Sequence, residues 1–313
     1  MILLWGLCGD GPFDAVTAAL QRRGVAVCLI DQRRVLQTGV ELRSDAELGG
    51  SLHYEGQTHE LNAMRAVYWR THDLRRVPEV VEAEALCNNG AALRAAYAVE
   101  QALVIWLEMT AACVVSRPSN MASNGSKPYQ MGIIKAHGFD VPDTLITTDP
   151  QAAKRFWTDK GAVIYKSVSG TRSIVSRLSN AHLSRLDDVA WCPTQFQQFV
   201  PGRDYRVHVV GEAVFASEIL SDAEDYRYAA RHGEPAELRA AQLPAEIEPR
   251  CVALAHAMGL PLAGIDLRCT PDDRWFCFEV NPSPGFTYYE AHTGQPIADA
   301  IAGLLIAATT NMQ

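Results

Sequence analysis

The most regular pattern of apolar and polar positions lies near the C-terminus, between Ala263 and Phe286. Side chains of the two kinds alternate there on both sides of the segment Pro271–Arg274, which has the composition of a turn. A period of two is the pattern of a β-strand with one buried face and one polar face. The apolar positions are Ile265, Leu267, Phe278 and Val280, and the polar positions are Asp266, Arg268, Glu279 and Asn281. We therefore predict a β-hairpin.

The polar face of this hairpin carries two carboxylates. We assume that Thr270 pairs with Trp275 beside the turn. Asp266 then lies directly opposite Glu279, and Asn281 follows on the same face. Two like charges in that arrangement destabilise a sheet, whereas a cation between them would stabilise it. Carboxylate and amide oxygens suit Mg²⁺, with water and phosphate completing its ligand shell. The alternative is a solvated sheet face that happens to be acidic.

The N-terminal third has the pattern of an α/β domain. Apolar runs over residues 2–7 and 25–30 flank a helical pattern over 13–23, and two buried strands joined by a helix indicate a parallel sheet. Up to residue 115 we further predict a hairpin over 52–62, a short strand over 66–69 that leads to Arg70, helices over 82–110 and a strand over 111–115.

The chain changes character in the polar, turn-rich segment 116–126, where we place a domain boundary. A helix is predicted to begin at Lys127, and a strand is predicted over 145–147. A further helix follows Asp149, and a strand over 162–165 ends at Lys166. The hydroxyl-rich segment Ser167–Ser173 comes next, and backbone N–H groups in such a segment can bind phosphates.

The C-terminal part is predicted to contain an antiparallel sheet. Strand patterns cover residues 194–200, 204–212 and 213–219 in close succession. The polar segment 222–242 lacks periodicity and is predicted to be a surface connection. Helices are predicted over 244–258 and 296–309, with the carboxylate hairpin between them.

Composition narrows the class of protein. The chain has 313 residues, of which 48% are hydrophobic and 20% charged, and this size suits two or three globular domains. A formal net charge of −8 and the lack of a basic tract argue against nucleic-acid binding. We find no signal peptide and no apolar run long enough to span a membrane. The eight cysteines form no CxxC pair, which favours reduced thiols in a cytoplasmic protein.

Four features in order carry a resemblance to a known family. They are a lysine that begins a helix after the boundary, a second lysine that ends a strand before a Ser/Gly loop, a strand that runs into Pro-Gly-Arg-Asp, and a hairpin that ends in Glu-Val-Asn-Pro. In these features the chain resembles the ATP-grasp superfamily, and within it the RimK-like branch that includes the peptide ligases of microviridin and other graspetides. The resemblance covers roughly residues 116–310, and the first 115 residues match only the general α/β domain that precedes the ATP-grasp fold.

The resemblance implies an α/β (α+β) architecture. We expect a parallel N-terminal domain over residues 1–115 and two α+β subdomains, over 116–192 and 193–313, that clasp the nucleotide. Members of the family use ATP and Mg²⁺ to activate a carboxylate as an acyl phosphate, which an amine or a hydroxyl then attacks. The implied cofactors are ATP and one or two Mg²⁺ ions, with Mn²⁺ as a substitute. The implied partners are a peptide or amino-acid substrate and a second copy of the chain.

The resemblance also implies roles for individual residues. Lys127 and Lys166 would contact phosphates, and the loop Ser167–Ser173, with Ser169 and Gly170, would close over them. The remaining roles are adenine binding by Gln198, Phe199 and Val200, ribose binding or loop placement by Asp204, Mg²⁺ binding by Asp266, Glu279 and Asn281, and catalysis by Arg206, Arg268 and Lys166.

Alternatives remain open for both the residues and the protein. Arg206 and Arg268 could instead form salt bridges within the sheet, Asp204 could be a turn residue, and His208 has the setting of a structural histidine. The protein could be a ligase for a small metabolite, or a nucleotide-binding module without ligase activity. The intact set of charged residues argues against the binding module.

Overall fold

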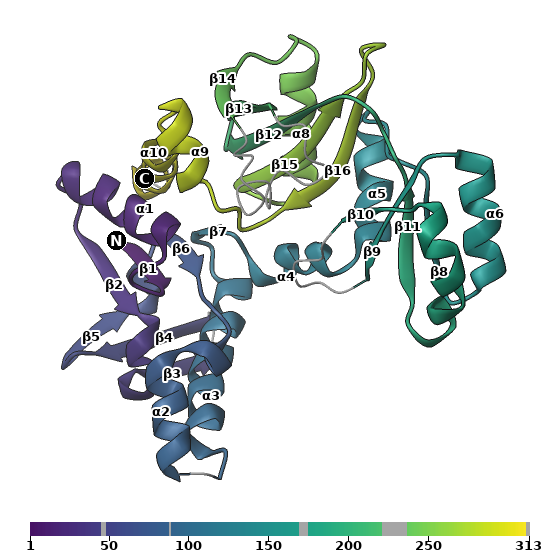
Figure 1. Ribbon diagram of the computed structural model, residues 1–313. Helices are drawn as coiled ribbons and strands as arrows, with labels where there is room; N and C mark the ends of the chain where they lie inside the picture. The colour runs from purple at the N-terminus through teal and green to yellow at the C-terminus, as the bar shows by residue number, and fades with distance from the viewer. Residues whose placement is uncertain (45–47, 88, 169–174, 221–236, 311–313) are drawn as a thin grey trace.

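The computed structural model describes residues 1–44, 48–87, 89–168, 175–220 and 237–310 (Figure 1). Within these residues the strands form four sheets. One sheet is parallel and lies in the N-terminal third, and the other three are antiparallel. The mixed α/β (α+β) class predicted from the sequence is therefore confirmed. None of the described helices is long and apolar enough to cross a membrane.

The parallel sheet has the strand order β2-β1-β6-β7. Its strands are β1 (Ile2–Gly6), β2 (Val27–Asp31), β6 (Ala66–Arg70) and β7 (Cys113–Val115), and α1 (Gly11–Arg22) connects the first two. Every residue of β1 is buried, as expected for a central strand that is covered on both faces. The predicted β-α-β unit is thus confirmed.

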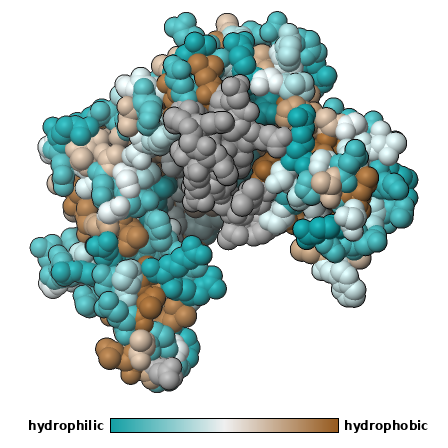
Figure 2. All heavy atoms as spheres, in the orientation of Figure 1, coloured by the Kyte–Doolittle hydropathy of each residue, from teal (hydrophilic) through white to brown (hydrophobic). Residues whose placement is uncertain are grey.

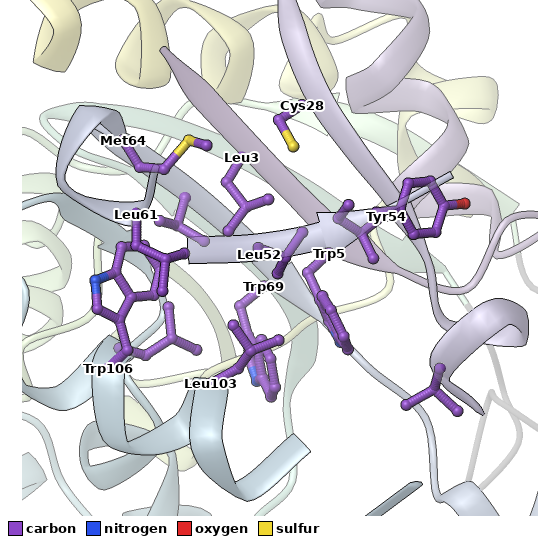
Figure 3. Packing of buried hydrophobic residues seen from close by; sticks show 14 of the residues in the cluster. Leu3, Trp5, Cys28, Leu52, Tyr54, Leu61, Met64, Trp69, Leu103 and Trp106 are labelled. Atoms are coloured by element: carbon purple, nitrogen blue, oxygen red, sulfur yellow. The ribbon is translucent and has the colours of Figure 1, made fainter. Parts of the chain in front are cut away.

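Two different layers cover this sheet. On one face, Leu3 and Trp5 pack with Trp69 and with residues of α3 and β4, and the rings of Trp5 and Trp69 stack with centroids 6.1 Å apart (Figure 3). On the other face, Ile2 and Leu4 pack with α1 and with the last helix. The elements of the first layer are β3 (Gly39–Ser44), β4 (Leu48–Tyr54), β5 (Gln57–Glu60), α2 (Pro78–Cys87) and α3 (Ala91–Met109), with short 3-10 helices over Gln32–Gln37, Leu61–Ala63 and Leu74–Arg76.

The central part of the chain forms a small sheet with the order β10-β9-β11-β8. A linking segment with α4 (Pro118–Met121) and a 3-10 turn over Ala122–Gly125 leads to α5 (Lys127–Ala136). The strands of the sheet are β8 (Thr144–Thr147), β9 (Val163–Ser167), β10 (Ser176–Arg177) and β11 (Thr194–Gln198). The helix α6 (Pro150–Lys160) connects β8 to β9, and the 3-10 segment Asn180–Trp191 connects β10 to β11. The helix predicted to begin at Lys127 and the strand predicted to end near Lys166 are both confirmed.

The C-terminal sheet is antiparallel, with the order β14-β13-β12-β15-β16. Its elements are β12 (Arg203–Val210), β13 (Ala213–Leu220), β14 (Glu237–Ala241), α8 (Ile247–Ala257), β15 (Leu262–Cys269), β16 (Trp275–Asn281) and α9 (Thr287–Thr293). Residues 237–241 were predicted to belong to a surface connection, and that prediction is wrong. In β14 only Leu238 is buried, because this edge strand has little core to face, so its sequence shows no alternation.

The last helix, α10 (Ile297–Thr310), packs both against the N-terminal domain and against the end of its own sheet, where Val210 and Leu262 share its core. Ile301 and Leu305 of α10 lie in one core with Val16 and Leu20 of α1, and Figure 1 shows the two helices side by side. The C-terminal end of the chain therefore ties the C-terminal sheet to the parallel sheet.

The carboxylate hairpin forms as β15 and β16, with a register that differs from the prediction in one half. Trp275 pairs with Cys269, and not with Thr270. The reason is the turn, since Thr270 N–H donates to Arg274 O at 2.9 Å and Asp273 takes a left-handed φ of 58°, which gives a three-residue loop rather than a four-residue one.

An irregularity in the ladder, between Cys277 and Glu279, then restores the predicted register, so that Asp266 does lie opposite Glu279. The extra residue is Phe278. Cys277 and Val280 enter the core below the sheet, whereas Phe278 lies under the guanidinium of Arg268, 5.2 Å from it. The assignment of Phe278 to the apolar face was therefore wrong.

The exposed large apolar side chains include several from α2 and α3. They are Val81, Leu86, Ile105 and Met109. In the space-filling view, brown apolar spheres gather at the lower left, over this helical lobe, whereas most of the visible surface is polar (Figure 2).

Candidate active site

Four charged side chains form a row across the C-terminal sheet and the helix at its edge. Arg206 Nη1 on β12 lies 2.6 Å from Asp266 Oδ1 on β15, and Asp266 faces Glu279 on β16. Lys127 Nζ at the start of α5 lies 3.2 Å from Glu279 Oε2. Each carboxylate thus has a cation on its outer side and the other carboxylate on its inner side. The two inner carboxylates can share a bound cation, which would remove their mutual repulsion.

The alternation of the strands explains why these residues share a face. Val207 and Ile265 point to the core beneath α8, so their neighbours Arg206 and Asp266 point to the opposite face. Asp204, Arg206 and His208 follow one another at every second position of β12 and share that face. The geometry thus brings Asp204, Arg206 and Asp266 to one face, and that this face carries the chemistry stays a prediction.

Gln130 holds Lys127 beside the hairpin. β16 is an edge strand, and on its open side Asp140 pairs with Phe276 while Gln130 of α5 bonds the backbone of Val280. Gln130 Nε2 donates to Val280 O at 2.8 Å, and Val280 N–H donates to Gln130 Oε1 at 3.2 Å. Lys127 lies three residues before Gln130, on the same helix face, so the bond that closes the sheet edge also directs the lysine towards Glu279. Sequence reasoning missed Gln130, although its spacing from Lys127 was visible.

A second ion pair lies next to this row. Arg268 binds Asp204 through two parallel hydrogen bonds, from Nε at 2.6 Å and from Nη2 at 2.7 Å. Its Nη1 donates to Val200 O at 2.7 Å. The salt bridges that were weighed as an alternative for Arg206 and Arg268 therefore exist, but the partner of Arg268 is Asp204 rather than Asp266 or Glu279. A bidentate pair of this kind fixes the turn between β11 and β12.

A cleft between the central sheet and the C-terminal sheet is lined by six of the fourteen predicted site residues, namely Lys166, Phe199, Asp204, Asp266, Arg268 and Glu279. Its charged lining residues are Asp204, Asp266, Arg268 and Glu279 from the C-terminal sheet and Lys166 from the central sheet. The other lining residues are Ile164, Val175, Gln197, Phe199, Tyr205, Ile219, Leu267 and Phe278. An apolar slot with charges at one end suits a flat base with a phosphate tail.

The residues predicted for the adenine slot are placed differently from one another. Phe199 lines the cleft, but Gln198 lines a separate cavity with Asp140 and Arg274, and it is Gln197 that faces the cleft. Successive strand residues point to opposite sides, so Gln198 points away from the cleft when its neighbour Gln197 points into it. The N–H groups of Gln198 and Phe199 already donate to carbonyl oxygens at 2.8 and 2.9 Å. The predicted role of Gln198, Phe199 and Val200 in binding a base stays a prediction.

The loop after β9 is described only in part. Ser167 ends β9 and is exposed. The predicted phosphate contacts Ser169 and Gly170 lie outside the described residues. The structure therefore leaves their assignment, like that of Lys166, as a prediction.

His208 lies on the same face of β12 as Arg206, and it is fully buried. Its ring is 5.1 Å from the ring of Tyr289 in an edge-on arrangement. Burial and the nearby Arg206 guanidinium hold the pKa of His208 well below its usual value. The ring is therefore neutral at physiological pH, which agrees with a structural role rather than a catalytic one.

The donor set on the hairpin fits a magnesium ion. Among the described residues, no group of three or more His, Cys, Asp or Glu side chains could hold a metal ion, so this is not a closed all-protein cage. Asp266 and Glu279 provide two adjacent carboxylates, and Asn281, one step along β16, provides an amide oxygen. Mg²⁺ is commonly bound by one or two carboxylates together with substrate phosphates and water.

Comparisons with known proteins agree with this arrangement. A family model described as the RimK-like ATP-grasp domain matches residues 124–305. A probable alpha-L-glutamate ligase of Aliivibrio salmonicida (strain LFI1238) is 29% identical over 190 residues, which cover 57% of this chain and 62% of the relative. The match thus spans about three fifths of that relative's length.

Solved structures resemble the whole chain. The ATP-grasp ligase PsnB, complexed with a phosphomimetic variant of its minimal precursor, Mg and ADP, has a TM-score of 0.82 at 26% identity, covering 99% of this chain and 98% of PsnB. A RiPP-associated ATP-grasp ligase of Chryseobacterium gregarium, in complex with ADP and a leader and core peptide, shows the same fold, with a TM-score of 0.81 at 24% identity over 98% of this chain and 96% of that one. The family match, the similarity to PsnB and the carboxylate hairpin together show that this chain belongs to the RimK-like ATP-grasp family.

Proposed function

We propose that this protein is an ATP- and Mg²⁺-dependent ligase that joins a carboxylate to an amine or a hydroxyl. One observation carries the proposal. Asp266 and Glu279 face each other across β15 and β16, and a basic side chain flanks each of them, Arg206 at 2.6 Å and Lys127 at 3.2 Å. Paired carboxylates between two cations are the arrangement that a metal-bound phosphate chain requires.

When bound, ATP supplies the phosphoryl group that activates the substrate carboxylate as an acyl phosphate, and Mg²⁺ neutralises phosphate charge. Asp266, Glu279 and Asn281 would hold the metal. Arg206 and Lys127 already lie beside the metal-binding carboxylates, so they would also lie beside phosphate oxygens and stabilise charge there. Lys166 projects into the cleft from the opposite sheet and would bind phosphate from the other side.

Arg268 has a different role in this scheme. Its three hydrogen bonds to Asp204 and Val200 hold the segment between β11 and β12 in place. We propose that Arg268 places the base-binding wall and the adjacent metal face relative to each other. Division of the chain into domains over 1–115, 116–192 and 193–313 belongs to the same proposal, with the nucleotide between the last two.

We propose a peptide as the substrate. PsnB and the Chryseobacterium gregarium ligase are named in complex with precursor, or with leader and core peptides, and PsnB is similar to this chain over nearly its whole length. A second candidate is the addition of an amino acid, since several curated relatives are named probable alpha-L-glutamate ligases. A homodimer remains a further prediction, and light scattering would test it.

The test is an assay with two readouts. The protein is incubated with ATP, Mg²⁺ and a short peptide encoded beside its gene, with and without glutamate, while ADP release and the peptide mass are followed. Ligation within the peptide predicts loss of water from the peptide, and amino-acid addition predicts a gain of one residue mass. The double variant Glu279→Ala/Asn281→Ala should release no ADP.

A matched control is Lys160→Ala, because Lys160 pairs with Asp143 at 2.6 Å on the outer side of the central sheet, whereas Lys166→Ala should lose activity. If wild-type protein binds no nucleotide with or without Mg²⁺, the proposal is wrong, and the hairpin is only an acidic sheet face.

A further inference from the structure

Arg70 connects the N-terminal domain to the segment that follows the metal hairpin. It is the last residue of β6, and its side chain is only 12% exposed. Its Nε binds Asp10, and its Nη1 donates to Ser283 Oγ at 2.9 Å, to Pro284 O at 3.2 Å and to Ser283 O at 3.4 Å. One guanidinium therefore holds two parts of the chain that are more than 200 residues apart.

The parallel sheet fixes Arg70 from behind. Gly6 of β1 pairs with Arg70, and a side chain on Gly6 would meet the Arg70 carbonyl oxygen at 2.7 Å. Asp10 caps α1 by accepting from Phe13 N–H at 3.2 Å. Burial is the largest single influence on the pKa of Asp10 and raises it, but the hydrogen bond and charge of Arg70, together with the Phe13 N–H and His72, lower it below the usual value. The pair is therefore charged and rigid at neutral pH.

The segment that Arg70 binds lies across the carboxyl edge of the parallel sheet. Ser116, directly after β7, donates from Oγ to Pro282 O at 3.3 Å, so a second strand end holds the same segment. Ligands of open α/β sheets bind at this edge. Here the edge is used to hold a piece of the neighbouring domain.

The segment in turn orients Asn281. Ser283 N–H donates to Asn281 Oδ1 at 3.0 Å. A carbonyl oxygen has two lone pairs, so Oδ1 can accept this bond and still bind a cation with the other pair. The direction of the second lone pair then depends on where Ser283 lies, and Arg70 determines that position.

We propose that Arg70 is a positioning residue for Asn281, through which the N-terminal domain sets the affinity of the hairpin for its divalent cation. This inference rests on the proposed function, because it takes Asn281 as a metal ligand. A residue that orients a metal ligand changes metal affinity by about 10- to 100-fold when it is removed. A residue that only joins two domains would instead lower stability and weaken nucleotide binding whether or not the metal is present.

The experiment measures ADP binding by calorimetry on the full chain, over a series of Mg²⁺ concentrations and without Mg²⁺. The variants are Arg70→Ala, the conservative Arg70→Lys, Ser283→Ala, Asn281→Ala and the double variant Arg70→Ala/Asn281→Ala. Arg22→Ala is the control. Arg22 also forms an ion pair from the N-terminal domain, with Asp299 of α10 at 3.3 Å, but this pair involves no residue of the hairpin or of the segment that follows it.

Arg70→Ala should raise the half-saturating Mg²⁺ concentration by about 10-fold or more and leave ADP binding without Mg²⁺ within about two-fold of wild type. Ser283→Ala should show a smaller shift, because Nη1 keeps its carbonyl partners. In the Asn281→Ala background, Arg70→Ala should add nothing, since both changes act on one ligand.

Two results would overturn the inference. One is an additive effect of Arg70→Ala in the Asn281→Ala background, and the other is an equal loss of ADP binding with and without Mg²⁺. If Arg70→Ala does not fold, Arg70→Lys and Ser283→Ala carry the same comparison. Wild-type protein that binds ADP without any Mg²⁺ dependence would instead disprove the metal role of the hairpin. Failure of the proposed function is therefore seen in the wild type, whereas failure of the role of Arg70 is seen only in its variants.

Discussion

Arg206 Nη1 lies 2.6 Å from Asp266 Oδ1, and the arginine side chain is only 8% exposed. The pair joins β12 to the first of the two hairpin carboxylates. On the far side of the row, Lys127 and Glu279 are about a quarter exposed and 3.2 Å apart. The two carboxylates are exposed to a similar extent, Asp266 at 33% and Glu279 at 27%, so the ends of the row differ in their cations, of which Arg206 is the more buried. The contact between Arg206 and Asp266 is also the shorter, and we therefore expect it to be the stronger of the two pairs.

This difference predicts that the two carboxylates respond differently to neutralisation. Asp266→Asn removes the negative charge 2.6 Å from the buried guanidinium of Arg206, so we expect a loss of about 1–3 kcal/mol in the free energy of unfolding. Glu279→Gln leaves the more exposed Lys127, for which we expect a loss of at most about 1 kcal/mol. Denaturant unfolding measures both. An equal loss from the two variants would contradict the argument.

Both changes should nevertheless remove the effect of Mg²⁺ on nucleotide binding, because each deletes one charged metal ligand. Asp143→Asn is the control, since this carboxylate pairs with Lys160 outside the cleft. Mg²⁺-dependent ADP binding that survives in Glu279→Gln would show that the metal lies elsewhere.

Replacement of Arg268 by lysine should weaken ADP binding by about 10-fold. Lysine keeps the charge but cannot make the two parallel bonds to Asp204 together with the bond to Val200 O, and the loss of a charge-assisted hydrogen bond costs about 1.5–3 kcal/mol. Calorimetry with ADP measures the change. Arg274→Lys is the control, because Arg274 pairs with Asp140 outside the nucleotide cleft. Wild-type affinity in Arg268→Lys would mean that the turn between β11 and β12 needs no guanidinium.

Gly264 allows a close approach that any side chain would block. It lies opposite Asn281 in the ladder, and a Cβ atom here would sit 2.6 Å from Pro284 Cβ and also collide with Arg206. We expect Gly264→Ala to destabilise the fold by about 1–3 kcal/mol and to weaken Mg²⁺ binding, because both Arg206 and the segment after Asn281 must shift.

Gly285→Ala is the matched control for that experiment, since a Cβ atom at Gly285 meets nothing within 4 Å. Thermal unfolding and the Mg²⁺ titration measure both variants. The packing argument fails if the two alanine variants behave alike.

Periodicity was sufficient to predict the faces of β15 and, apart from Phe278, of β16. The alternation around Ile265 and Val280 placed Asp266 opposite Glu279, and the structure has that pair. It was insufficient for the turn, because nothing in Pro-Asp-Asp-Arg indicates that Asp273 takes a left-handed φ. The bulge at Phe278 compensates for the shorter loop, so the pair was predicted correctly from a register that was wrong beside the turn.

Other features of the site depend on contacts between distant segments. Arg70 and Ser283 are 213 residues apart, and no local pattern fixes the relative placement of the parallel sheet and the hairpin. Which of Gln197 and Gln198 lines the cleft depends on which side of β11 faces it. Because both residues are glutamines, the pattern of hydrophobic positions does not distinguish them. Residues 287–293 form the helix α9, which was not predicted, because Tyr288 and Tyr289 belong to no helical apolar repeat that would indicate it.

His208 predicts a contribution to the pH dependence of stability. Its folded pKa lies well below the usual value, which is about 6.5 for the unfolded chain. Between these two pKa values the unfolded state binds the extra proton, so the stability due to neutral His208 is present above about pH 6.5 and is lost as the pH falls below it. The slope from this one residue is at most about 1.4 kcal/mol per pH unit.

We therefore expect the free energy of unfolding of wild type to fall more steeply than that of His208→Gln between pH 7 and pH 5, measured by urea denaturation. His59→Gln, at a half-buried position of β5, is the control for replacing a histidine outside the C-terminal sheet. Parallel curves for wild type and His208→Gln would mean that the ring gains a proton in the folded protein as easily as in the unfolded chain.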